Sequence, residues 1–115
     1  MFLFENLVVY KKSLSFVEFV YVLVKKWPKE ELFSLTDQCK RAATSISLNI
    51  AEGNSRTSKD FRRFLDIARG SCFECLAIFS IAKNQHFIDD QQFRTLYIQL
   101  EELTKMLQGL KKSLL

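Results

Sequence analysis

Residues that turn or break a chain occur at only three places in this sequence. They are Trp27-Pro28, Gly53-Asn54-Ser55 and the stretch from Asn84 to Ile88. Proline cannot continue a helix and disfavours helical geometry in the residue before it. With three glycines and one proline in 115 residues, the chain lacks the turn residues that an all-β fold needs every 8–12 positions or so. The sequence therefore predicts an all-α fold, and its length predicts one domain over residues 1–115.

The three breaks define four predicted helices, at about residues 5–26, 30–52, 59–85 and 90–114. We expect Gly53 to end the second helix and Ser58 to cap the start of the third. Asp89 and Gln92 have the spacing of a capping box at the start of the fourth helix. Connections this short make neighbouring helices antiparallel. The expected architecture is an up-down-up-down antiparallel four-helix bundle.

Apolar residues recur at helical spacing in the predicted helices. In the fourth, leucines and one phenylalanine alternate at three and four positions, the pattern of a helix that packs in a bundle. These residues are Phe93, Leu96, Leu100, Leu103, Leu107, Leu110 and Leu114. The second and third helices repeat the pattern with smaller side chains, among them Cys39, Cys72 and Cys75. We expect these positions to form the core.

The first predicted helix is apolar on more than one face. Over residues 7–24 the only residues that are not apolar are Lys11, Lys12, Ser13, Ser15 and Glu18. A helix of this kind must be covered on more than one face. We expect a second subunit to cover the additional face, at Phe16, Phe19, Val20 and Leu23. The alternative is that the N-terminal segment wraps across the bundle.

Few residues offer catalytic or metal-binding chemistry. His86 falls in a predicted loop with no partner pattern. Cys72 and Cys75 have the spacing of metal ligands, but there is no second pair, and both occupy core positions of a helix. Cys39 is a third thiol at a core position, which is typical of a reducing compartment. We expect no enzymatic activity, no cofactor and no metal.

A polar stripe runs along the second predicted helix beside its apolar positions. In an antiparallel pair joined at residues 53–58, residues at equal height have numbers that sum to a constant. The facing pairs are then Arg41 with Glu74, Asn49 with Arg63 and Glu52 with Arg62. Buried ion pairs specify pairing more reliably than they stabilise it. We expect Arg41, Asn49, Glu52 and Glu74 to form a structural polar network that sets the register of the two helices.

Positive charge gathers at one end of the predicted bundle. The formal net charge is +4, and residues 56–69 hold five basic residues against Asp60 and Asp66. The up-down topology brings two lysines of the fourth helix to the same end. The candidate nucleic-acid-binding residues are Arg56, Lys59, Arg62, Arg63, Arg69, Lys111 and Lys112. Binding to phosphates would be sensitive to salt and not sequence-specific. The alternative is that these residues only solubilise the helix ends.

No membrane-spanning segment is expected, because no apolar run reaches about 18 residues. The first residues, Met1-Phe2-Leu3-Phe4-Glu5, contain no basic region followed by a cleavage site. We therefore expect a cytoplasmic protein with no signal peptide and no contact with a membrane.

Several motifs are shared with one known family. They are Phe4-Glu5-Asn6-Leu7, Leu35-x-x-Gln38-x-x-Arg41-Ala42, Ser45-Ile46-x-x-Asn49-Ile50-Ala51-Glu52-Gly53, Ala68-x-Gly70-Ser71-x-x-Glu74 and the leucine-rich last helix. In these the chain resembles the small bacterial four-helix-bundle proteins encoded by intervening sequences in 23S ribosomal RNA genes. It departs from their pattern at Cys72-Phe73 and in having no long basic tail.

The resemblance implies a bundle that assembles as a ring, commonly a homopentamer, with no established catalytic activity. A related group comprises accessory proteins to the reverse transcriptases of diversity-generating retroelements. We therefore expect a homo-oligomeric, non-enzymatic accessory protein that associates with RNA or DNA. The alternative is a structural module that binds a protein, such as a polymerase or reverse transcriptase, without contacting nucleic acid.

Overall fold

Four long helices make up most of the computed structural model, which describes residues 2–114. They are α1 (Val8–Val24), α2 (Leu35–Asn54), α3 (Ser58–Asn84) and α4 (Asp90–Ser113). Two short 3₁₀ helices, η1 (Leu3–Asn6) and η2 (Lys29–Glu31), precede α1 and α2. The described residues contain no strand. The prediction of an all-α fold with four helices is confirmed.

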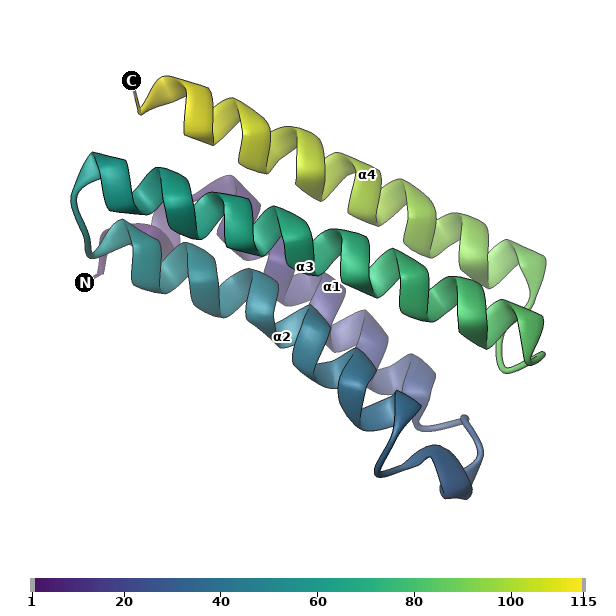
Figure 1. The fold of residues 1–115 in the computed structure, drawn as a ribbon. Helices are drawn as coiled ribbons and strands as arrows, with labels where there is room; N and C mark the ends of the chain where they lie inside the picture. Colours follow the sequence, from purple (N-terminus) through teal and green to yellow (C-terminus); the bar gives the residue numbers. More distant parts are fainter. Residues whose placement is uncertain (1, 115) are drawn as a thin grey trace.

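The helices run up and down along the long axis of the molecule (Figure 1). α3 packs along both α2 and α4, while α1 packs mainly against α2 and makes a smaller contact with α4. The α2–α3 turn, the start of α1 and the end of α4 lie at one end of the bundle (Figure 1). The α1–α2 and α3–α4 connections lie at the other end. The expected up-down-up-down topology is therefore confirmed.

The start of α4 agrees with the sequence, whereas the start of α3 differs by one residue. The Asp89 carboxylate accepts a hydrogen bond from the Gln92 backbone N–H at 2.7 Å, and the Gln92 side chain accepts from the Asp89 N–H at 2.9 Å. In α3 the capping residue is Thr57, whose hydroxyl accepts from the Asp60 N–H at 3.2 Å. Ser58 is thus the first residue of the helix, and the prediction that it is the cap is wrong.

Gly53 lies inside α2 and does not terminate it. The helix continues to Asn54, and no glycine has a positive φ. A Cβ atom at position 53 would lie 2.6 Å from Phe64 Cβ and 2.8 Å from Phe61 Cδ1. The missing side chain therefore allows α3 to approach α2 closely. The prediction of a helix-ending glycine is wrong, because the reason for this glycine lies in the neighbouring helix.

The end of α3 uses a left-handed residue that is not glycine. His86 has a φ of 65°. Its N–H donates to the Lys83 carbonyl at 3.0 Å, and the Phe87 N–H donates to the Ala82 carbonyl at 2.8 Å. These two hydrogen bonds define a Schellman motif, which satisfies carbonyls that would otherwise be left free at a helix end. His86 therefore has a backbone role in the turn to α4.

The core contains the predicted apolar positions of α2, α3 and α4. In α4 the buried residues are Leu96, Leu100, Leu103 and Leu107, with Phe93, Leu110 and Leu114 packed beside them at the two ends. The thiols of Cys39, Cys72 and Cys75 are free and buried in the same core. Burial raises the pKa of Cys39 and Cys72 to about 12 and raises the pKa of Cys75 as well. The thiols are therefore small core residues, as expected.

Three of the four α1 residues that we expected at a subunit boundary face the core of their own chain instead. Phe16, Val20 and Leu23 are buried in the core of the chain itself, so they do not form the expected subunit boundary. Of the four residues predicted there, Phe19 alone is partly exposed, at 37%. The spacing of apolar residues gave a wrong prediction because the polar Ser13 lies on the buried face of α1. Its hydroxyl donates to the Tyr10 carbonyl at 2.6 Å and shares a hydrogen bond of 2.7 Å with the Ser47 hydroxyl, which makes its burial tolerable.

Candidate nucleic-acid interface

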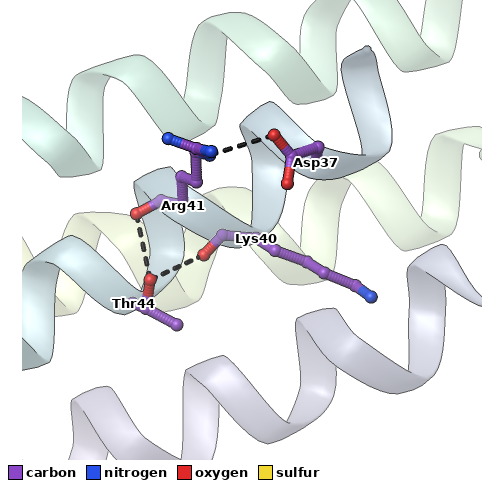
Figure 2. Close-up of polar contacts among 4 residues, drawn as sticks. All are labelled: Asp37, Lys40, Arg41 and Thr44. Carbon is purple, nitrogen blue, oxygen red and sulfur yellow. Dashed lines mark hydrogen bonds and ion pairs between the residues drawn. The ribbon is translucent and has the colours of Figure 1, made fainter. Parts of the chain in front are cut away.

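The polar stripe of α2 makes its ion pairs within the helix. Figure 2 shows Arg41 Nε directed at the Asp37 carboxylate, 2.9 Å away and one turn back. Glu52 pairs in the same way with Arg56, at 3.0 Å. Among residues 2–114 no ion pair joins Arg41 to Glu74, although both line one shallow groove. Within residues 2–114 the predicted network of Arg41, Asn49, Glu52 and Glu74 therefore lacks its ion pairs between helices, because Arg41 and Glu52 each pair within their own segment of chain. Because 80% of the Arg41 side chain is exposed, its charge needs no carboxylate from another helix, and Asp37 at i−4 serves as its partner.

Serine hydroxyls make the polar contacts that connect α2 to its neighbouring helices. Ser71 on α3 donates to Ser45 on α2 at 2.9 Å. Asn49 donates to the same Ser45 hydroxyl at 2.9 Å and to the Ser45 carbonyl at 2.8 Å. Together with the Ser13–Ser47 hydrogen bond, these contacts connect α2 to both of its neighbours. Sequence reasoning missed them, although their small side chains fall where the helices approach closely.

The basic residues predicted to bind nucleic acid surround one end of the bundle, which we call the basic end. Arg56 lies in the α2–α3 turn, and Lys59 lies in the first turn of α3. Arg62, Arg63 and Arg69 follow along α3, and Lys111 and Lys112 lie in the last turn of α4. Figure 1 shows that the end of α4 and the α2–α3 turn lie at the same end of the molecule. The topology therefore brings together the residues that the sequence singled out.

Two arginines of the basic end share one aromatic ring. The guanidinium carbons of Arg63 and Arg56 lie 4.8 and 5.4 Å from the centroid of the Phe64 ring. Cations are attracted to the face of an aromatic ring. Phe64 thus holds two like charges close together. Arg56 pairs with the carboxylate of Glu52, whereas Arg63 has no carboxylate partner within residues 2–114.

A groove between α3 and α4 gathers three more cations. It has a volume of about 150 Å³ and is lined by Leu65, Asp66, Arg69, Leu107, Gln108, Lys111 and Lys112. The Lys111 ammonium lies 2.9 Å from both carboxylate oxygens of Asp66. Arg69 and Lys112 have no carboxylate partner among the described residues. The lining of the groove therefore has a net positive charge, and Leu65 and Leu107 form its apolar part.

Two guanidinium groups retain unused hydrogen-bond donors. Nε of Arg62 and Nε of Arg69 are buried, and neither donates to an acceptor within residues 2–114. The Arg69 guanidinium carbon lies 5.1 Å from the centroid of the Phe73 ring, a cation–π contact between neighbouring turns of α3. An arginine held in this way can offer its remaining N–H groups to an anion. Phosphate oxygens are acceptors suited to that geometry.

Other chemistry finds little support in the described side chains. Over residues 2–114 no group of three or more histidine, cysteine, aspartate or glutamate residues is placed to hold a metal ion. His86 is exposed in the turn before α4. No helix in the described part of the chain combines the length and the apolar character needed to cross a membrane.

Comparisons with known proteins give a family and a solved structure. A family model described as 23S rRNA-intervening sequence protein matches residues 5–109. The chain is 28% identical to a protein of unknown function from the S23 ribosomal protein family of Bacteroides thetaiotaomicron, whose crystal structure it resembles with a TM-score of 0.84. That similarity covers 91% of this chain and 96% of the other. No curated protein matches the chain.

Proposed function

The chain belongs to the 23S rRNA-intervening sequence protein family, and from this premise we propose that it is a non-enzymatic, self-associating bundle that contacts nucleic-acid phosphates. The observation that carries the proposal is the groove between α3 and α4. There Arg69, Lys111 and Lys112 meet with Asp66 as the single carboxylate of the lining. The Arg56–Arg63 pair on Phe64 extends the positive surface toward the α2–α3 turn.

The proposed contact is made with the phosphate backbone. Lysine and arginine supply most of the affinity of proteins for nucleic acid by neutralising phosphates and releasing their counterions. Base recognition needs side chains that reach base edges or stack on them. The groove offers charge, and Phe64 is buried beneath its arginines rather than open for stacking. We expect binding that depends on salt and not on sequence.

Self-association is supported by apolar surface that one copy leaves uncovered. Val22 on α1 is 62% exposed and Ile98 on α4 is 55% exposed. Contiguous exposed apolar residues mark interaction surfaces in many proteins. Assembly of identical copies would also multiply the field of each basic end. By family resemblance we propose a ring, with five copies as the expected number.

The non-enzymatic part of the proposal rests on the state of the nucleophiles. A cysteine reacts as its thiolate. Because burial raises the pKa of Cys39 and Cys72 to about 12, both are protonated and inaccessible near neutral pH. The serines with interhelical hydrogen bonds lie beside other hydroxyls and carbonyls, and none of them donates to a histidine.

Filter binding of a structured RNA at two salt concentrations tests the nucleic-acid contact. The informative variant is R69Q/K112Q, which removes two unpaired cations from the groove. The matched control is K25Q/K29Q, which removes two exposed cations near the opposite end. We expect the wild-type protein to bind at low salt and weaken as salt rises. The groove variant should lose on the order of tenfold in affinity, and the control far less.

Two results would overturn this part of the proposal. One is a wild-type protein that does not bind at low salt, and the other is an equal loss in the groove variant and its control. Either would favour the second candidate function, a module that binds protein. The observation favouring that candidate is the pair of apolar hollows beside α4, lined by Phe19 and Val22 on one side and by Tyr97 and Ile98 on the other.

A further inference from the structure

Two apolar hollows lie on different sides of α4. The first, of about 440 Å³, lies between α1 and α4 and is lined by Ser15, Glu18, Phe19, Val22, Leu23, Lys26 and Gln92. We call Glu18, Phe19 and Val22 of α1, together with Lys26 in the turn just after it, the α1 face. The second, of about 690 Å³, follows α4 on its α3 side. Its lining is Lys83, Asp90, Gln91, Phe93, Arg94, Tyr97, Ile98 and Glu101, of which Lys83 and Asp90 pair with each other at 3.3 Å. We call the four exposed residues Arg94, Tyr97, Ile98 and Glu101 the α4 groove.

The α4 groove extends along the molecule toward α3. A further hollow of about 250 Å³ shares Tyr97 and Glu101 with it and is also lined by Phe73 and Leu76. Phe73 is 58% exposed, so the groove has an aromatic wall on α3 as well as one on α4. A groove of this shape, lined by apolar side chains from two helices, is suited to receive the apolar side of a third helix.

The α1 face has the spacing of a docking helix. Its four residues occur at i, i+1, i+4 and i+8, so the three in α1 follow one side of that helix. The α4 groove has its residues at i, i+3, i+4 and i+7 of α4. In the α1 face and in the α4 groove alike, two apolar residues therefore lie between two charged residues in the sequence.

The charges of the two surfaces are complementary. The α1 face has the acidic Glu18 at its N-terminal end and the basic Lys26 at its C-terminal end, whereas the α4 groove begins with Arg94 and ends with Glu101. Eight positions along the chain separate Glu18 from Lys26, and seven separate Arg94 from Glu101, which is about 10.5 Å of α4 at about 1.5 Å per residue. Over residues 2–114 none of these four side chains forms an ion pair.

We infer that the α4 groove of one copy receives the α1 face of a second copy. This inference rests on the self-association proposed above and names the surfaces that perform it. With α1 of the second copy parallel to α4, Glu18 faces Arg94 and Lys26 faces Glu101. Phe19 and Val22 then pack against Tyr97 and Ile98.

The two surfaces are different, so the contact is head-to-tail. In such a contact one copy keeps its α1 face free and the other keeps its α4 groove free, so the same contact can repeat from copy to copy. A repeat whose rotation closes produces a ring. The expected assembly is therefore cyclic and not a two-fold dimer.

A charge-swap series measured by light scattering tests the inference. The variants are E18R, R94E and the double variant E18R/R94E, with K29E as a control outside both surfaces. Each single variant opposes two like charges, so association should weaken on the order of tenfold or more. The double variant restores an opposite pair and should recover the wild-type size, while K29E should assemble normally.

The outcomes separate this inference from the broader proposal. A monomeric wild-type protein would contradict self-association itself. An assembled wild type whose size is unchanged in both single variants would leave self-association standing and overturn the docking surfaces. If a single variant loses its helical circular dichroism, V22C/I98C provides an independent measurement. Mild oxidation of this variant should link copies into a ladder on a denaturing gel, and an assembled protein that yields no ladder would overturn the inference.

Discussion

Gly53 of α2 and Phe64 of α3 are so close that a Cβ atom on the glycine would lie 2.6 Å from the phenylalanine Cβ. Real Cβ atoms do not approach this closely, so a larger residue must push the helices apart. The contact lies next to the α2–α3 turn, which contains Arg56, and Phe64 directly follows Arg62 and Arg63 on α3. The distance between α2 and α3 and the position of the basic end thus both depend on Gly53.

Replacing Gly53 by alanine should destabilise the protein by about 1–3 kcal/mol, because the added methyl group overpacks the α2–α3 contact. Chemical denaturation measures the change. The control is Gly70→Ala, since a Cβ there meets nothing within 4 Å and alanine favours helix. That control should stabilise by about 0.5–1 kcal/mol. A stabilising Gly53→Ala change would show that the helices separate without penalty.

Replacing His86 by glycine should raise stability by about 1 kcal/mol, because a residue with a side chain is strained in the left-handed region. The Schellman hydrogen bonds of Phe87 and residue 86 involve only backbone atoms and remain available. Gln85→Gly is the matched control, since Gln85 has a φ of −85° and gains nothing from glycine. Thermal unfolding compares the two variants, and equal melting temperatures would contradict the role given to His86.

The Ser13–Ser47 hydrogen bond should show coupling in a double-mutant cycle. Either single alanine variant leaves a buried hydroxyl without its partner across the helices, which costs about 1–3 kcal/mol. The double variant removes both hydroxyls and should be less destabilised than the sum of the singles. Denaturant titration of all four proteins measures the coupling. Strictly additive effects would show that the two hydroxyls act independently.

Stability should fall in alkaline solution because of the buried thiols. In the folded protein the pKa of Cys39 and Cys72 is about 12, above the ordinary value of 9.0. The unfolded chain therefore loses these protons at lower pH than the folded chain does. The contribution of the thiols is complete below pH 9 and is lost as the pH rises toward 12.

Urea unfolding at a series of pH values between 8 and about 11 measures this loss. The control is a variant with alanine at Cys39, Cys72 and Cys75, which keeps every other side chain of the protein. Its stability should be lower throughout, because cavities replace the thiols. Its decline with pH should nevertheless be shallower than that of the wild type. Identical slopes would show that the thiols do not contribute.

The features that sequence predicted best depend on residues close together in the chain. The capping box of Asp89 and Gln92 spans three residues, and the leucine pattern of α4 identifies one face of one helix. The up-down topology then brings Lys111 and Lys112 to Arg69 in one groove. Whether that groove binds nucleic acid stays a prediction.

The features that sequence missed depend on contacts between helices. The buried side of α1 could not be identified from its pattern, because Ser13 is polar until Ser47 from α2 supplies its hydrogen bond. Gly53 looked like a helix end, because Phe61 and Phe64 that pack over it belong to the next helix. Arg41 was expected to face Glu74 on α3, but it pairs with Asp37 one turn back on its own helix (Figure 2).

α1 begins, and α4 ends, at the same end of the bundle as the α2–α3 turn (Figure 1). A purification tag, a fluorophore or a fused domain attached beyond either helix would therefore emerge at the basic end and compete with a large ligand there. The α3–α4 turn around His86 lies at the far end and is exposed. Reporters for binding experiments are better placed at that turn, where they leave the basic end open to solvent.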